Sequence, residues 1–105
     1  MSKEPGRYDA LTERTIAAVT TTPGHTSPRL RRALVERADD GIDEELSRYV
    51  ATVRQHAYQV TDDDVTALQR DGYEDDEIFE LTVATALGSA LLRLQRGMSA
   101  LEESR

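Results

Sequence analysis

The chain is 105 residues long, with 38% apolar and 31% charged residues, a net charge of −7 at pH 7 and no cysteine. This length suits one small domain, and the lack of cysteine excludes disulfides, thiolate catalysis and cysteine-based zinc sites. The negative charge argues against nucleic acid as a partner, because phosphate binding needs a basic face. No apolar run nears the roughly 20 residues of a membrane helix and no signal-peptide pattern opens the chain, so we expect a cytoplasmic protein without membrane contact.

The N-terminal quarter is the least regular part of the sequence. Residues 1–26 are predicted to be a flexible or weakly ordered arm, although residues 8–20 have the spacing of a short helix. Pro23 and Gly24 must end that helix, because both residue types disfavour helical backbone. A single helical domain is predicted over residues 27–105.

Hydrophobic periodicity predicts four further helices and no strand. They run from Ser27-Pro28 to a stop at Gly41, from about Asp43 to Tyr58, from Thr61 to Gly72, and from near Asp75 to about Glu103. Serine, threonine and aspartate are favoured residues before the first turn, and glycine is favoured after the last. The predicted fold class is therefore all-α, a small bundle of four to five helices with a long C-terminal helix.

The long C-terminal helix is apolar on nearly all sides. No charged residue occurs between Leu81 and Leu92, and a helix of that kind is usually buried all round. Its predicted length of about 43 Å exceeds the roughly 30–35 Å diameter of a compact domain of this size. We therefore expect it to pack against a second copy of the chain, through an interface of Phe79, Val83, Ala84, Leu87, Gly88, Leu91 and Leu94.

The second half of the sequence carries a recognisable order of features. A helix, a glycine, a short acidic turn and a long alanine-rich helix are formed by Ala67-Leu68, Gly72, Asp76-Glu77-Ile78-Phe79-Glu80 and Arg93-Leu94. With its flanks from Tyr49 onward, this block resembles the carboxymuconolactone decarboxylase and alkylhydroperoxidase D-like family. The resemblance implies an all-helical fold that oligomerises, commonly as trimers or hexamers.

The resemblance also implies where redox residues would lie. In the peroxidase branch, a Cys-x-x-Cys pair and a histidine four residues later precede the glycine. Alignment on Gly72 places these positions near Ala57, Val60 and Asp64, none of which matches. Alignment on His56 again leaves both cysteine positions without sulfur, so the resemblance implies a cysteine-less member of this type, and no family site transfers to the chain.

Three residues are candidates for acid–base chemistry: His56, Glu80 and Arg93. His56 lies beside Tyr58, and an imidazole with a pKa near neutrality can transfer protons; a histidine satisfied at a helix surface or interface is the alternative. Glu80 lies at the edge of the apolar block, where burial would raise its pKa or require an arginine partner, Arg54 or Arg93. For Glu80, structural pairing is the alternative to catalysis.

The sequence predicts no metal site and no cofactor. His25 lies in a turn-rich connector and is expected to be exposed, and two histidines without ligand spacing do not form a metal site. The acidic run 62–64 lacks the alternating ligands and the central glycine of a calcium loop. Phosphate loops and dinucleotide-binding glycine runs are also missing.

Three functional hypotheses follow. The leading one is a non-redox, homo-oligomeric binding or scaffolding protein. The second is a cofactor-independent decarboxylase or lyase-type enzyme that acts on a small organic acid, with His56, Glu80 and an arginine around an intersubunit pocket. The third is a partner subunit whose apolar helix docks onto a different protein.

Overall fold

The computed structural model describes residues 7–21 and 23–104, and within them every regular element is helical. The elements are α1 (Arg7–Thr21), α2 (Pro28–Glu36), α3 (Glu44–His56), the short 3-10 helix η1 (Ala57–Gln59), α4 (Asp62–Arg70) and α5 (Asp75–Glu103). The prediction of an all-α fold with a long C-terminal helix is therefore confirmed.

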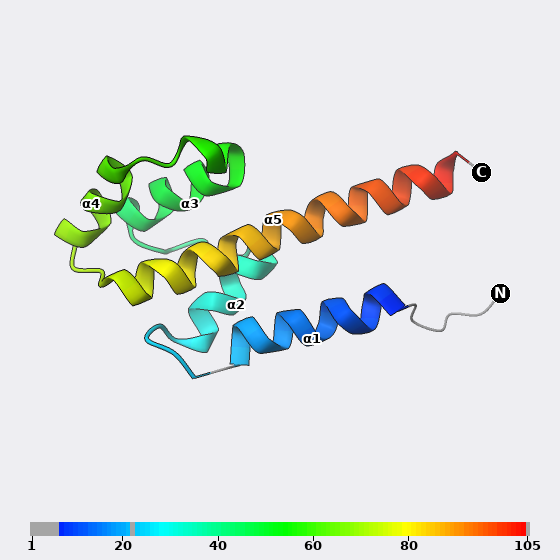
Figure 1. Ribbon diagram of the computed structural model, residues 1–105, viewed down its shortest axis with the longest axis horizontal. Coiled ribbons are helices and arrows are strands. Elements are labelled where there is room, and N and C mark those ends of the chain that lie inside the picture. The colour runs from blue at the N-terminus through cyan, green and yellow to red at the C-terminus, as the bar shows by residue number, and fades with distance from the viewer. Residues whose placement is uncertain (1–6, 22, 105) are drawn as a thin grey trace.

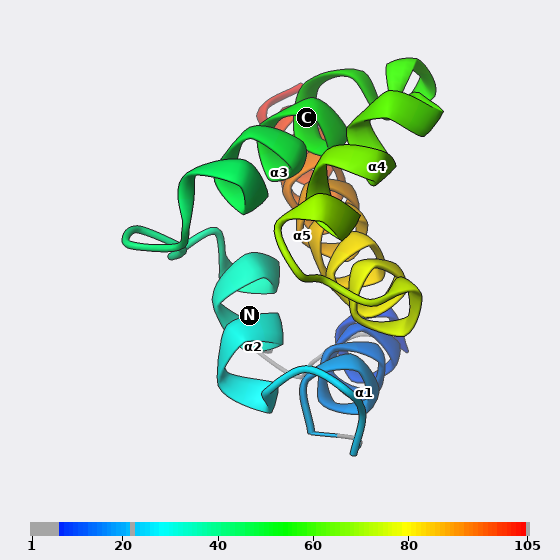
Figure 2. The same cartoon turned by 90° about the vertical axis from the view of Figure 1, so that its left-hand side faces the viewer.

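Helix α5 runs through the middle of the molecule and beyond it. Helices α1 and α2 lie on one side of α5, and α3 and α4 lie on the other (Figures 1 and 2). The first half of α5 is enclosed by these neighbours, whereas its second half projects past α2, α3 and α4. The molecule is consequently elongated, with extents of 53 × 29 × 22 Å.

Local sequence signals set the start of α2 as predicted, but not its end. The Ser27 hydroxyl accepts a hydrogen bond of 3.1 Å from the amide of Leu30, and Pro28 occupies the first turn. The helix ends at Arg37, which adopts the left-handed backbone conformation with φ 58°. The predicted stop at Gly41 therefore lies too far along, because Arg37 takes the conformation that glycine usually provides.

Helices α3 and α4 begin at side-chain caps, and a tyrosine in the loop between α4 and α5 contacts the cap of α3. Asp43 accepts from the amide of Leu46 at 2.9 Å, and its other oxygen accepts the hydroxyl of Tyr73. Thr61 and Asp64 form a capping box at the start of α4. These caps satisfy amides that have no partner within the helix, so they define where each helix starts.

The core lies where α2, α3 and α4 meet the first half of α5. Leu34 and Leu81 are fully buried, and Val50 and Leu68 are exposed by only 1%. The whole buried apolar cluster consists of Leu34, Val35, Leu46, Tyr49, Val50, Val53, Leu68, Ile78, Leu81 and Ala84. One face of α5 is thus fixed inside the protomer.

Of the flexible or weakly ordered arm expected over residues 1–26, residues 1–6 lie outside the described residues. Residues 7–21 form α1, and Thr20 near its end is exposed by only 1%. The buried guanidinium of Arg31 donates a hydrogen bond of 2.8 Å to the carbonyl of Val19. Packed structure therefore begins earlier than predicted, because α2 supplies a donor to the carbonyl end of α1.

Candidate functional site

Helix α5 carries an apolar stripe on the face that is turned away from the core. Its members are three or four residues apart, a spacing that keeps side chains on one side of a helix. The large members are exposed by 38% to 68%. We define this apolar stripe as Phe79, Val83, Ala86, Ala90, Leu94, Gly97, Met98 and Leu101, all of which are exposed.

The residues predicted for an oligomer interface separate into two groups in the structure. Ala84 and Gly88 are buried inside the protomer, which corrects their assignment to an interface. A Cβ atom at position 88 would lie 2.6 Å from the carbonyl oxygen of Val35, so the small residue here allows α2 to pack closely on α5. The other five are half-buried, as for Leu87 and Leu91, or exposed, as for Phe79, Val83 and Leu94.

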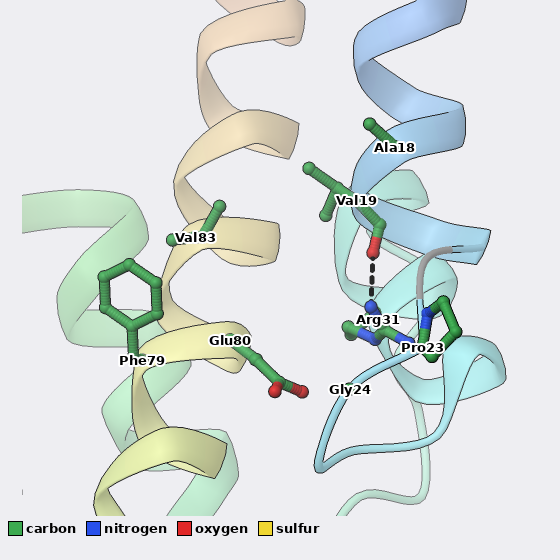
Figure 3. A pocket seen from close by; sticks show the side chains of 8 residues that line it. All are labelled: Ala18, Val19, Pro23, Gly24, Arg31, Phe79, Glu80 and Val83. Atoms are coloured by element: carbon green, nitrogen blue, oxygen red, sulfur yellow. Dashed lines mark hydrogen bonds between the residues drawn. The ribbon is translucent and has the colours of Figure 1, made fainter.

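A pocket of about 180 Å³ opens between the last turn of α1 and the first turns of α5 (Figure 3). Phe79 and Val83 line it from α5, and Ala18 and Val19 line it from α1. The remaining lining residues are Pro23, Gly24, Arg31 and Glu80. The pocket is therefore a mainly apolar depression that continues the first part of the apolar stripe toward α1.

The carboxylate of Glu80 ties the connector between α1 and α2 to α5. One oxygen accepts hydrogen bonds from the amide and the hydroxyl of Thr26, at 2.8 and 2.7 Å. The other accepts from the amide of His25 at 2.8 Å and lies 3.1 Å from its Nδ1. The Nε2 atom of His25 lies 3.5 Å from the carboxylate of Asp76. We call this group of residues, His25, Thr26, Asp76 and Glu80, the connector tie.

The connector tie shifts the pKa values of its acid and its base in opposite directions. Burial alone would raise the pKa of Glu80, but the hydrogen bonds from His25 and Thr26 outweigh burial and lower it to about 2. The hydrogen bond to Glu80, with the charge of Asp76, raises the pKa of His25 above its ordinary value of 6.5. The pair therefore favours an ionised carboxylate beside a protonated imidazole.

Glu80 has a histidine and a threonine as its partners, which corrects the expectation of a raised pKa or an arginine. Arg54 instead forms a bidentate pair with Asp39, with N–O distances of 2.6 and 3.2 Å. Arg93 is exposed and lies thirteen residues further along α5, about 20 Å away along the axis. Each arginine therefore lies outside the connector tie.

The structure does not bring His56 to Glu80. His56 ends α3, where it is exposed and makes an edge-to-face contact with Tyr58 at a centroid distance of 6.0 Å. The carboxylate of Glu80 is occupied by the connector instead. The histidine that does meet Glu80 is His25, which sequence analysis treated only as an exposed connector residue. No local pattern marks it, because fifty-five residues separate the two in the chain.

Other ligand classes receive no support from the part of the chain that the structure describes. Among residues 7–21 and 23–104, no group of three or more histidine, cysteine, aspartate or glutamate side chains is placed to hold a metal ion. Within those same ranges, no helix combines the length and the apolar character needed to cross a membrane. Comparison of the chain with protein-family models, with curated proteins and with solved structures finds no match.

Proposed function

We propose that this chain is a non-redox, homo-oligomeric binding or scaffolding protein that assembles through α5. The observation that carries the proposal is the exposed apolar stripe, which lies on the opposite side of α5 from the core. Phe79 is 68% exposed and Leu101 is 50% exposed. Contiguous apolar surface of this kind on a small protein marks an interaction site.

The energetics of the second half of α5 support the same proposal. From Arg93 onward its residues are exposed on every side, including Leu94, Met98 and Leu101. A helical segment without tertiary packing is only marginally stable in water. Full burial of one leucine or methionine side chain contributes about 1.5–3 kcal/mol. Covering this segment with a partner therefore stabilises both the helix and the assembly.

The family resemblance and the absence of cysteine supply the remaining part of the proposal. Carboxymuconolactone decarboxylase-like proteins oligomerise through their helices, which fits an interface on α5. Thiol peroxidase chemistry requires cysteine, and this chain has none. We therefore expect no peroxide turnover with thiol donors, and activity in that assay contradicts a non-redox role.

Sedimentation velocity at micromolar concentrations tests the proposal. We expect the wild-type chain to form a stable oligomer and Leu94→Glu to be monomeric, because a charge then interrupts the apolar stripe. The matched control is Gln95→Glu, which adds the same charge on the same exposed turn but on the other side of α5. A monomeric wild-type chain overturns the proposal, and a complex with an unlike chain replaces it with the partner-subunit hypothesis.

A cofactor-independent decarboxylase or lyase-type enzyme is the second candidate. It is favoured by one observation, the contact of His25 with Glu80 at the rim of the apolar pocket. A histidine can serve as a general acid or base. Assays of carbon dioxide release from small organic acids test it: turnover that His25→Gln abolishes supports an enzyme, and turnover that is unchanged in this variant contradicts the role of His25.

A further inference from the structure

All members of the apolar stripe except Met98 are arranged symmetrically about Ala90. Six of them lie 4, 7 and 11 residues before and after this position, as Ala86 and Leu94, Val83 and Gly97, and Phe79 and Leu101, whereas Met98 lies opposite Thr82. A two-fold axis that passes beside Ala90, perpendicular to α5, brings each member opposite its counterpart on a second antiparallel helix. An isologous interface requires this kind of self-complementary surface.

The sizes of the facing side chains are also complementary. The axis places Leu94 opposite the small Ala86, and Val83 opposite Gly97, while Ala90 meets Ala90 of the second copy. Alternation of large and small residues across an interface lets the two surfaces interdigitate without voids. The small pair at the axis allows the two helices to approach each other most closely at their midpoint.

The shape of the protomer fits the antiparallel direction. The first half of α5 lies among α2, α3 and α4, and its second half projects past these three helices (Figure 1). Antiparallel docking lays each projecting half along the embedded half of the other copy. The apolar pocket beside Phe79 then receives the end of the stripe around Leu101 of the second copy, and both exposed surfaces are covered at once.

Charge does not oppose the two-fold axis. Both ends of α5 are acidic, with Asp75, Asp76 and Glu77 in its first turn and Glu102 and Glu103 at its other end. Acidic groups therefore face each other at the ends of the two helices in either direction of docking, and the antiparallel direction rests on the size and shape of the facing surfaces. Arg93 is the only charged residue between Glu80 and Arg96, so no like charges meet near the axis.

We infer that two copies of this chain dock antiparallel along their apolar stripes, with a two-fold axis beside Ala90. The inference rests on the proposed homo-oligomeric function and adds the partner surface, the direction and the register. Leu101 of each copy covers the pocket between α1 and α5 of the other copy.

Single-cysteine variants test this register cleanly, because the chain has no cysteine of its own. In Ala90→Cys, the two introduced thiols face each other at the axis. Mild oxidation is therefore expected to give at least about tenfold more disulfide-linked dimer than in the control Gln95→Cys. Ala86→Cys alone is expected not to link, because its counterpart then lies about 12 Å along the axis. Mixed Ala86→Cys and Leu94→Cys chains are expected to link to each other.

The outcomes separate failure of the register from failure of the proposed function. Circular dichroism first establishes that each variant keeps its helices. An oligomer in which Ala86→Cys links to itself, or in which Ala90→Cys does not link, overturns the antiparallel register and leaves the homo-oligomer standing. A wild-type chain that sediments as a monomer overturns both.

Discussion

The two halves of α5 both carry large apolar side chains, but they lie in different environments. The first half, Asp75–Leu91, packs one face against α2 and α3, and Leu81 and Ala84 there are fully buried. The second half, Leu92–Glu103, carries Leu94, Met98 and Leu101 into solvent. The comparison shows that apolar content alone does not place a helix inside a protein. The neighbours that reach it decide which face is covered.

The two glycines of α5 show the same contrast at the scale of one atom. A Cβ atom at Gly88 would meet the carbonyl oxygens of Leu34 and Val35 at 2.9 and 2.6 Å, whereas a Cβ atom at Gly97 would meet nothing within 4 Å. The first glycine is required by the packing of α2 on α5. The second is open to substitution within one protomer.

The largest expected effect is the difference between two leucine truncations. Leu81→Ala leaves a cavity in the core and is expected to lower the free energy of unfolding by about 3 kcal/mol. Leu94→Ala removes an exposed side chain and is expected to leave the stability of the isolated protomer within about 0.5 kcal/mol. Urea denaturation at one low protein concentration measures both variants. Equal losses would contradict the difference between the two halves.

The next effect concerns Gly88. In Gly88→Ala, the new methyl group collides with backbone carbonyl oxygens that cannot rotate away, so α2 and α5 must separate. We expect the free energy of unfolding to fall by about 2 kcal/mol, as for other overpacked sites. Thermal unfolding followed by circular dichroism measures it, and a variant as stable as the wild type shows that the two helices are less closely packed than the structure has them.

The pKa shifts in the connector tie predict that the stability of the protein depends on pH. Glu80 has a pKa of about 2 against an ordinary 4.5. Its contribution to the free energy of unfolding is therefore present above pH 4.5 and is lost as the pH falls toward 2. The pKa of His25 is raised above 6.5, so its contribution is present below pH 6.5 and is lost as the pH rises through the raised value. The tie should therefore be strongest between pH 4.5 and 6.5.

Glu80→Gln tests this window. Glutamine keeps one acceptor oxygen, but its amide nitrogen cannot accept the hydrogen bonds that the second oxygen of Glu80 receives, so we expect the free energy of unfolding to fall by about 2 kcal/mol at pH 5.5 and by less near pH 2. Unfolding curves of the wild type and of this variant at several pH values measure the difference. A loss that is equal at every pH shows that the charge of Glu80 contributes nothing to the tie.

The smallest expected effect lies in the second half of α5. Gly97→Ala replaces a poor helix former with the best one at an exposed position, so it should raise stability by up to about 1 kcal/mol in the protomer. In the antiparallel assembly the methyl group would face Val83 of the second copy. Stability at low concentration and sedimentation at high concentration separate the two effects, and destabilisation of the dilute chain contradicts an open environment.

Much of the fold follows from short-range patterns in the sequence. The predicted bounds of the last helix, near Asp75 and about Glu103, agree with those of α5. The predicted caps at Ser27 and Thr61 are also present. These features depend on residues within one or two turns, and local rules describe such interactions well.

The candidate site could be predicted only in part. Glu80 was singled out correctly as a partly buried carboxylate, but its partners were not. His25 and Thr26 reach it across more than fifty residues. Periodicity and capping patterns contain no information at that separation.

The sequence by itself determined the helical class, the helix starts and the length of α5. Only the tertiary structure decided which face of α5 is buried, which of its small residues serve core packing, and that His25 lies against Glu80. The physical reason is the distance along the chain over which each kind of interaction acts. Helix formation and capping are set by neighbours in the chain, whereas α5 is apolar on opposite faces and its orientation depends on where α2 and α3 dock.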